Sequence, residues 1–265
     1  MGLYNNRIVV KVGTSTLTND AGKSDLRTTD RLACVLSDIQ NMGYEVVLVS
    51  SGAIAVGRNK LNMTAKPDSM RMKQAAAAVG QCSLMYLYDK FFGDYDKTVA
   101  QILLNADDIE EEEKKENLIN TFNALLEMGV IPIVNENDSV SYKEIESEDR
   151  LFGDNDMLSA VVAVLCRAKH LVIFSDIDGF YDHDPRLYPN AQLIDQIDTI
   201  DDSVYALAGG AGSRRGTGGM RTKLQAASLA TSQGTNTIVT NGKRPEVLYD
   251  IVKGGSAGTL FPGKI

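Results

Sequence analysis

Residues near position 220 combine the side chains and backbone that bind phosphate groups. The run Gly216-Thr217-Gly218-Gly219 holds three glycines and a hydroxyl, and Thr222 and Lys223 follow where a helical pattern begins. Glycines let backbone N–H groups approach an anion closely, and the start of a helix attracts negative charge. The spacing of glycine and lysine is not that of a Walker A loop. The segment therefore predicts a clamp for a polyphosphate. The alternative is a glycine loop before a core helix, with no ligand.

A second candidate phosphate contact follows the first apolar run of the chain. Residues 8–10 are aliphatic, Lys11 interrupts the run, and Gly13 comes two residues later. In an open α/β sheet, ligands bind beyond the carboxyl ends of the strands. Lysine supplies a flexible point charge for phosphate, and a glycine lets the backbone approach it. We therefore predict that Lys11 and Gly13 contact ATP. The alternative is a surface lysine before an ordinary turn.

The sequence offers little for general base catalysis. His170 and His183 are its only histidines, and neither neighbours a serine or cysteine turn of catalytic type. A carboxylate substrate that attacks ATP is already ionised and needs no base, but the transfer needs cations to neutralise charge. We predict Lys11 and Lys223 as these catalytic cations and Asp156 as the anion that holds both lysines in place. Mg²⁺ would be carried mainly by phosphates and water, and no zinc-type cluster is present.

Short apolar runs alternate with amphipathic segments, and this alternation predicts an α/β fold with a mostly parallel sheet. Buried strands are expected at 8–10, 46–49, 99–104, 130–134, 171–174 and 237–240. Pro132 predicts that its strand lies at an edge of the sheet or has an irregular register. No G-x-G-x-x-G follows the first strand, which removes the main support for a nicotinamide oxidoreductase.

A long helix is expected to begin after Pro67-Asp68-Ser69. Its predicted buried stripe consists of Ala75, Val79, Cys82 and Tyr86. The methionines and aromatic residues of this helix are interpreted as core or subunit contacts rather than as a cofactor site.

The composition limits the classes of function. With 43% hydrophobic and 23% charged residues, the 265-residue chain fits a soluble globular protein with a large core. A formal net charge of −8 argues against a nucleic-acid partner, because such proteins usually carry a basic surface. Three cysteines without a C-x-x-C pair fit a reduced, cytoplasmic protein, and no apolar run approaches the length of a membrane span.

Six motifs together resemble the bacterial glutamate 5-kinases (γ-glutamyl kinases) of the amino acid kinase family, over nearly the whole chain. They are Val10–Ser15, Ser51–Ala55, Asn135–Asp138, Gly153–Asp156, Asp184–Arg186 and Gly216–Lys223. The resemblance implies a three-layer αβα sandwich forming one amino acid kinase domain over residues 1–265. Its glutamate-binding lobe would span about 1–168 and its ATP-binding lobe about 169–265. It also implies that ATP phosphorylates the γ-carboxylate of L-glutamate to L-glutamyl 5-phosphate, the first step of proline biosynthesis.

The resemblance also assigns individual residues. Those implied to bind ATP are Lys11, Ser175, Asp176, Thr217, Gly218, Gly219, Met220, Arg221, Thr222 and Lys223; those implied to bind glutamate are Ser51, Asp138 and Asn155. The substrate's chemistry agrees for Asp138, because the α-ammonium of free glutamate needs a carboxylate partner. The alternatives are that Asp138 caps its own turn and that Ser51 is a helix N-cap.

The resemblance further implies feedback inhibition by L-proline and a homo-oligomer, either a dimer or a tetramer. Many members carry a C-terminal PUA module, which is not expected here because the chain ends shortly after Phe261. The segment Ser139–Phe152 is longer than usual and flanks the predicted glutamate site. Kinases of N-acetylglutamate, aspartate, carbamate or a nucleoside monophosphate are alternatives within the fold. The turn Asn135–Asp138 favours glutamate. A nucleotide-binding regulator without catalysis is the alternative from another class, and the pair of lysines speaks against it.

Overall fold

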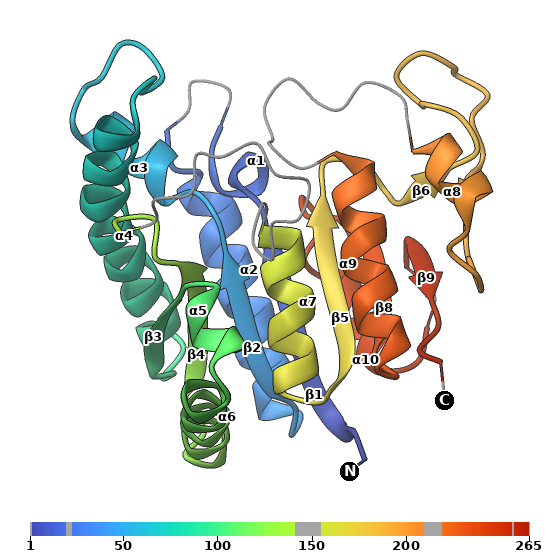
Figure 1. Cartoon of the computed structure of the whole chain (residues 1–265), viewed down its shortest axis with the longest axis horizontal. Helices are drawn as coiled ribbons and strands as arrows, with labels where there is room; N and C mark the ends of the chain where they lie inside the picture. The colour runs from blue at the N-terminus through green and yellow to red at the C-terminus, as the bar shows by residue number, and fades with distance from the viewer. Residues whose placement is uncertain (1, 20–22, 141–154, 209–218, 256, 265) are drawn as a thin grey trace.

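The structure is a computed structural model that describes residues 2–19, 23–140, 155–208, 219–255 and 257–264. Its strands are β1 (Tyr4–Val12), β2 (Glu45–Ser50), β3 (Val99–Leu104), β4 (Ile131–Glu136), β5 (Ala168–Ser175), β6 (Phe180–Tyr181), β7 (Leu193–Ile194), β8 (Asn236–Asn241) and β9 (Thr259–Phe261). Seven of them form a central sheet in the order β3-β4-β2-β1-β5-β8-β9 (Figure 1). All neighbours in it pair in parallel except β8 and β9. The predicted α/β fold with a mostly parallel sheet is confirmed.

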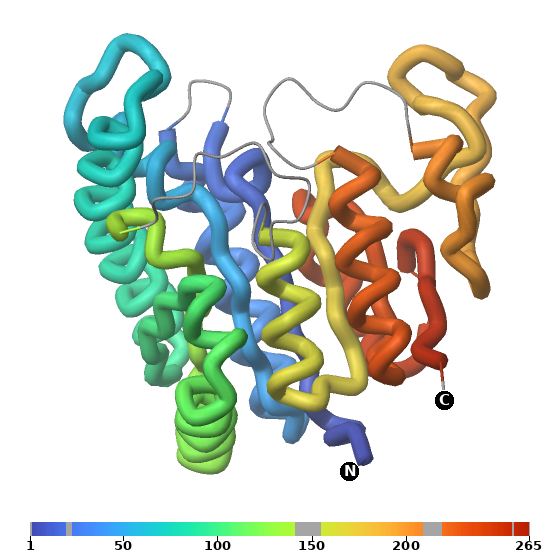
Figure 2. Tube along the Cα trace, viewed as in Figure 1, coloured from blue at the N-terminus to red at the C-terminus, as the bar shows by residue number. Residues whose placement is uncertain are grey.

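Helices cover both faces of this sheet. They are α1 (Thr14–Leu17), α2 (Leu26–Asn41), α3 (Ala53–Lys60), α4 (Met70–Gly93), α5 (Asp107–Glu110), α6 (Glu112–Glu127), α7 (Asn155–Leu165), α8 (Asp202–Leu207), α9 (Met220–Ser232) and α10 (Val247–Val252). Figure 2 shows the segments of α7 and α9 side by side in front of the sheet. The expected three-layer arrangement is thus present.

Alternate residues of the buried strands serve two separate cores. On β1, Val9 packs with α6, α7 and α9, whereas Ile8 and Val10 pack with α2, α4 and α10. Successive side chains of a strand point to opposite faces, so a strand covered on both faces reads as a continuous apolar run. This double burial explains why the strands were visible in the sequence.

The position of Pro132 in the sheet differs from the prediction. Its strand, β4, lies between β3 and β2, and β3 is the strand at that edge. The register between β3 and β4 runs without a shift, with Pro132 opposite Ala100. The β2–β4 ladder contains only Ile133 and Val134 of β4. Pro132 lies before this ladder, so its missing N–H removes no hydrogen bond from the ladder. An interior strand therefore accommodates this proline.

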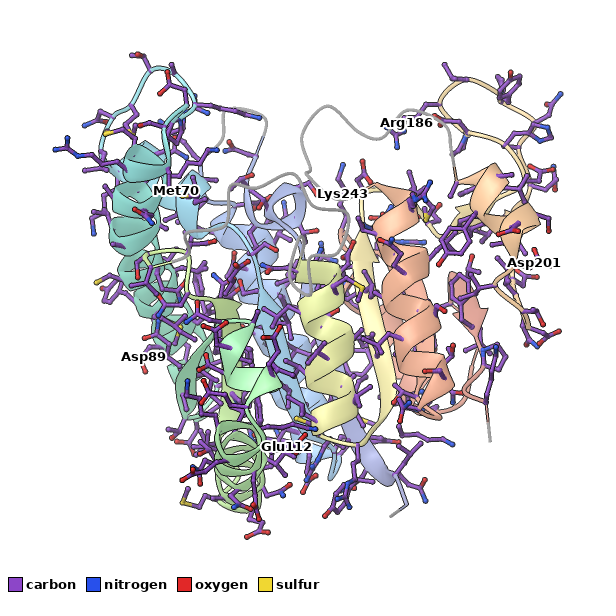
Figure 3. All side chains as sticks on the ribbon, in the orientation of Figure 1. Met70, Asp89, Glu112, Arg186, Asp201 and Lys243 are labelled. Atoms are coloured by element: carbon purple, nitrogen blue, oxygen red, sulfur yellow. The ribbon has the colours of Figure 1, made fainter. Side chains whose placement is uncertain are left out.

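The buried face of α4 also differs from the prediction. The helix begins after Ser69 as expected and runs from Met70 near the carboxyl edge of the sheet past Asp89 (Figure 3). The predicted stripe is largely on the surface: Tyr86 is 68% exposed, and Cys82 and Tyr86 line a groove beside α3. Ala76, Ala77 and Gly80 are buried in the part of α4 that α3 approaches closely, and larger residues such as Tyr88 and Phe92 are buried further along. A Cβ on Gly80 would lie 1.7 Å from the carbonyl oxygen of Ala53, so only glycine fits there.

The chain changes direction across the sheet next to β1. Strands β2, β3 and β4 lie on one side of β1, and β5 lies on the other side. Open α/β sheets bind ligands beyond the carboxyl ends of the strands at such a switch point. These ends point towards the top of Figure 1. None of the described helices combines the length and apolar character needed to cross a membrane.

Candidate active site

Three charged side chains from separate elements meet at this edge of the sheet. Lys11, near the end of β1, places its Nζ 2.7 Å from Oδ1 of Asp156, and Lys223 of α9 places its Nζ 3.0 Å from Oδ2 of the same residue. The residues are 5%, 0% and 7% exposed for Lys11, Asp156 and Lys223. Water screens such buried pairs much less than surface pairs. One carboxylate therefore holds two ammonium groups from opposite ends of the sequence.

Asp156 occupies the first turn of α7, where a negative charge is favoured by the helix dipole. Burial alone would raise the pKa of this carboxyl, but the ammonium groups of Lys11 and Lys223 outweigh burial and hold the pKa well below its usual range. The hydroxyl of Thr222 donates to Oδ2 of Asp156 across 2.8 Å. The carboxylate is therefore ionised at neutral pH and is held by Lys11, Lys223 and Thr222, among other contacts.

Gly13 lies beside the first lysine. It precedes α1, and its carbonyl accepts hydrogen bonds from the backbone of Thr16 and Leu17. A Cβ on Gly13 would lie 3.5 Å from Nζ of Lys11, so a longer side chain would cover the ammonium. Glycine at this position places no side chain against the ammonium.

The residues expected to bind glutamate lie at the neighbouring strand ends. Asn155 directly precedes Asp156 on α7, and its Nδ2 lies 2.7 Å from Oγ of Ser51, which follows β2. The same Nδ2 lies 3.0 Å from the carbonyl oxygen of Ser50. The first turn of α7 thus contributes to both groups: Asp156 to the lysines and Asn155 to Ser51.

Asp138 lies just past the end of β4 and differs from Asp156 in its surroundings. Its carboxylate makes no hydrogen bond or ion pair with any residue that the structure describes. Partial burial raises the pKa of Asp138 to about 6. A carboxylate kept from water without a partner is costly, and a cationic ligand would relieve that cost.

The structure describes only some of the remaining residues that are predicted to contact ATP. Ser175 ends β5 next to β1, and its hydroxyl donates to Asp176 across 3.3 Å. Gly219 and Met220 begin α9, and the guanidinium of Arg221 lies 5.9 Å from the ring centre of Tyr205, to which it turns. Thr217 and Gly218 lie outside the described residues, as do Gly153 and most of Ser139–Phe152.

Neither histidine belongs to this centre. His170 is on β5, where burial lowers the pKa of its ring, and His183 pairs with the exposed Asp182 at 3.3 Å. No group of three or more His, Cys, Asp or Glu side chains suited to a metal occurs within the described parts of the chain. Asp156, the most buried acid of the centre, already has a lysine on each oxygen. These residues therefore do not form a protein cage for Mg²⁺.

Two side chains near the expected glutamate site, Asn135 and Gln81, were not predicted from the sequence as individual site residues. Oδ1 of Asn135 accepts from Nδ2 of Asn155 at 3.1 Å, and Nδ2 of Asn135 donates to Oε1 of Gln81 at 2.9 Å. Asn135 follows an apolar run at a strand end, which is a usable signal. Gln81 lies inside a helix with no motif around it, so nothing in the sequence indicates its role.

Comparisons with known proteins identify the family of the chain. Residues 6–241 match the model of the amino acid kinase family. A glutamate 5-kinase of Clostridium perfringens is 55% identical over 97% of this chain and 96% of that protein. A glutamate 5-kinase of Enterococcus faecalis is 48% identical over 96% of this chain and 94% of its own length.

Solved structures show the same fold at low identity. A carbamate kinase from Giardia lamblia bound to AMP-PNP superposes with a TM-score of 0.67 at 16% identity, covering 98% of each chain. A UMP kinase from Ureaplasma parvum gives a TM-score of 0.64 at 18% identity, covering 97% of this chain and 98% of that one. The expected resemblance to glutamate 5-kinases is confirmed, and the chain belongs to the amino acid kinase family.

Proposed function

We propose that this protein transfers the γ-phosphoryl group of ATP to the γ-carboxylate of L-glutamate, giving L-glutamyl 5-phosphate and ADP, the first step of proline biosynthesis. The observation that carries this proposal is the pair of buried ammonium groups, Lys11 and Lys223, held on the two oxygens of Asp156. High identity to glutamate 5-kinases over nearly the full chain supports the choice of acceptor.

The reaction requires charge neutralisation rather than proton transfer. An oxygen of the glutamate γ-carboxylate forms a bond to the γ-phosphorus while the bond from that phosphorus to the β,γ-bridging oxygen breaks, and ADP leaves. Lys11 and Lys223 would face the negative oxygens of the transferring group, and Asp156 would keep both ammonium groups aimed. The described residues give Mg²⁺ no cage, so we assign the metal to the phosphates and water and route no step through a protein ligand.

Asp138 supports a free amino acid as the acceptor. Its carboxylate has no partner among the described residues, and its raised pKa, about 6, reflects burial. The α-ammonium of glutamate would form an ion pair with this carboxylate, whereas the neutral amide of N-acetylglutamate would not. Ser51 and Asn155 would add further contacts to the carboxylate and ammonium groups on the α-carbon of the amino acid.

A hydroxamate assay tests the proposed reaction, because hydroxylamine traps acyl phosphates. With ATP and Mg²⁺, we expect hydroxamate from L-glutamate and little from N-acetylglutamate or aspartate. Hydroxamate from one of those acids instead of glutamate would overturn the acceptor. ATP hydrolysis with no hydroxamate from any acid would overturn the acyl phosphate product.

The proposal includes a division of the chain into two lobes. We assign glutamate to the lobe of about residues 1–168 and ATP to the lobe of about 169–265, so that Lys11 and Lys223 come from different lobes.

The proposal also includes the assembly of the protein and its regulation. We expect a cytoplasmic homo-oligomer, a dimer or a tetramer, inhibited by L-proline. Met72 and Tyr86, 40% and 68% exposed on α4, support a subunit contact on that helix. Size-exclusion chromatography with light scattering measures the assembly.

A further inference from the structure

A chain of side-chain amides connects the middle of α4 to the expected glutamate site. Gln81 accepts from Asn135 at 2.9 Å, and Asn135 accepts from Asn155 at 3.1 Å. Asn155 in turn donates to Ser51 at 2.7 Å. We call these four residues the amide relay. Gln81 and Asn135 are 9% and 2% exposed, so the inner half of the relay is shielded from water.

The direction of the relay follows from its backbone neighbours. The backbone N–H of Glu136 donates to Oδ1 of Asn135 at 2.9 Å, so the Nδ2 end of Asn135 must face Gln81. Nδ2 of Asn155 lies within hydrogen-bond distance of three oxygens, those of Ser51, the Ser50 carbonyl and Oδ1 of Asn135, and its two hydrogens are shared among them. Because the Ser50 carbonyl and Oδ1 of Asn135 can only accept, Nδ2 rather than Oδ1 of Asn155 must face them. Each amide therefore has one compatible orientation.

This direction determines which atoms remain for a ligand. Oγ of Ser51 accepts from Asn155, so its own hydrogen is available to donate. Oδ1 of Asn155 makes no hydrogen bond with the described residues, so it is available to accept. A donor beside an acceptor matches the carboxylate and ammonium groups on the α-carbon of a free amino acid. The relay thus fixes a polarity that suits the proposed substrate.

Only the side-chain oxygen of Gln81 makes a hydrogen bond with the described residues. Its Nε2 is buried and has no hydrogen-bond partner among the described residues, although buried polar groups are nearly always paired. A glutamine that leaves its donor unmet needs another reason for its presence, and the acceptor bond from Asn135 supplies one. The neighbouring Gly80 allows the backbone of α4 to approach α3 closely, and this approach determines the position of Gln81.

We propose that Gln81, on α4 and outside the phosphoryl-transfer centre, is a positioning residue for the acceptor amino acid. Its Oε1 holds the amide of Asn135, and through Asn155 this fixes the donor of Ser51 and the acceptor of Asn155. The inference rests on the proposed function, because that proposal assigns Ser51 and Asn155 to glutamate.

Steady-state kinetics of Gln81→Leu test the inference. Leucine removes the acceptor and leaves Nδ2 of Asn135 buried without a partner, so we expect the KM for glutamate to rise about tenfold, the effect of one unmet buried donor. The KM for ATP and the kcat at saturating glutamate should stay within about twofold, because the lysine centre is untouched. An unchanged KM for glutamate would overturn the proposal.

Two further variants separate positioning from general damage to α4. Gln81→Glu keeps an oxygen for Asn135 in either protonation state, so the KM for glutamate should return to within about threefold of wild type. Tyr95→Phe removes a different hydrogen bond at the end of α4, the 3.0 Å contact from the hydroxyl of Tyr95 to Asp30, which involves no partner of the relay. It should lower the melting temperature and leave the KM for glutamate unchanged. If Tyr95→Phe raises that KM as much as Gln81→Leu does, the effect is structural and the proposal fails. The variant Gln81→Met replaces Gln81→Leu if leucine prevents folding.

Failure of the proposed function has a different signature. Ser51→Ala should raise the KM for glutamate in the same assay, because it removes the donor itself. If the wild-type enzyme does not phosphorylate glutamate, or if Ser51→Ala leaves this KM unchanged, the assignment of the glutamate site is wrong. If Ser51→Ala raises it and Gln81→Leu does not, only the role of Gln81 is wrong.

Discussion

Of the two aspartates of the candidate site, Asp156 has charged partners and Asp138 has none among the described residues. Asp156 is fully buried with an ammonium group on each oxygen, and its pKa lies well below the usual range. Asp138 is partly buried with no partner in the described residues, and its pKa is raised to about 6. The first region has its charges arranged before any ligand binds. The second has a negative charge that a cationic group of a ligand would pair with. The region of Asp156 is therefore suited to catalysis, and the region of Asp138 is suited to substrate recognition.

Replacing the paired carboxylate should have the largest effect. Asp156→Asn leaves two buried ammonium groups without their anion, so we expect the free energy of unfolding at pH 7 to fall by about 3–5 kcal/mol. Because the folded-state pKa of Asp156 is depressed, its contribution is present above about pH 4 and is lost as the pH falls through the folded-state pKa. Urea unfolding at pH 7 and pH 3 measures this, with the exposed Asp89→Asn of α4 as control. A loss equal to that of the control would show that the pairing is not stabilising.

Removing one cation should affect the reaction step. Lys223→Ala takes away one of the two ammonium groups, and we expect kcat to fall at least about a hundredfold, from lost stabilisation of transition-state charge. Initial rates of ADP formation measure this, with Lys114→Ala on the exposed side of α6 as control. Turnover near the wild-type rate would exclude the assigned role of Lys223.

Removing the unpaired carboxylate should affect one substrate only. Asp138→Ala should raise the KM for glutamate roughly thirtyfold, the effect of one charge-assisted contact, and should change the KM for ATP little. In the wild type, protonation of Asp138 below about pH 6 should raise the KM for glutamate by about tenfold per pH unit. Ser139→Ala, at the exposed neighbour, is the control. Equal changes in both KM values would place Asp138 outside the glutamate site.

The smallest expected effect has the opposite sign to the first. Asp138→Asn removes a carboxylate that is costly to ionise, so we expect the free energy of unfolding at pH 7 to rise by about 1–2 kcal/mol. The raised folded-state pKa means that stability falls as the pH rises from about 4 to about 6, so the gain should vanish near pH 4. Thermal melts at both pH values measure it. A loss of stability at pH 7 would mean that Asp138 has a stabilising partner.

The layout of the fold could be predicted because doubly buried strands leave apolar runs that a single sequence displays. The edge position for the strand of Pro132 was wrong, because the sequence does not show which residues of a strand the ladder uses. The buried stripe of α4 was wrong for a related reason. Where helix backbones touch, as at Gly80, small residues are buried and a larger neighbour such as Tyr86 is left outside, so side-chain size does not show which face is buried there.

The candidate site was predictable only where residues stand at the ends of strands and helices. Lys11, Asp156 and Lys223 do so, and the structure brings them together. Gln81 has no such position, and its contact with Asn135, 54 residues away, depends on how α4 packs. Long-range contacts of that kind arise from tertiary packing, which motif spacing does not encode.

The most direct test is to follow an oxygen atom from glutamate to phosphate. L-Glutamate labelled with ¹⁸O in its γ-carboxylate is incubated with ATP, Mg²⁺ and hydroxylamine, and the released inorganic phosphate is analysed by mass spectrometry. If the ionised carboxylate attacks the γ-phosphorus between Lys11 and Lys223, each phosphate released with hydroxamate carries one ¹⁸O. Phosphate without the label would show that the carboxylate oxygen never bonded to phosphorus, and would contradict the proposed reaction.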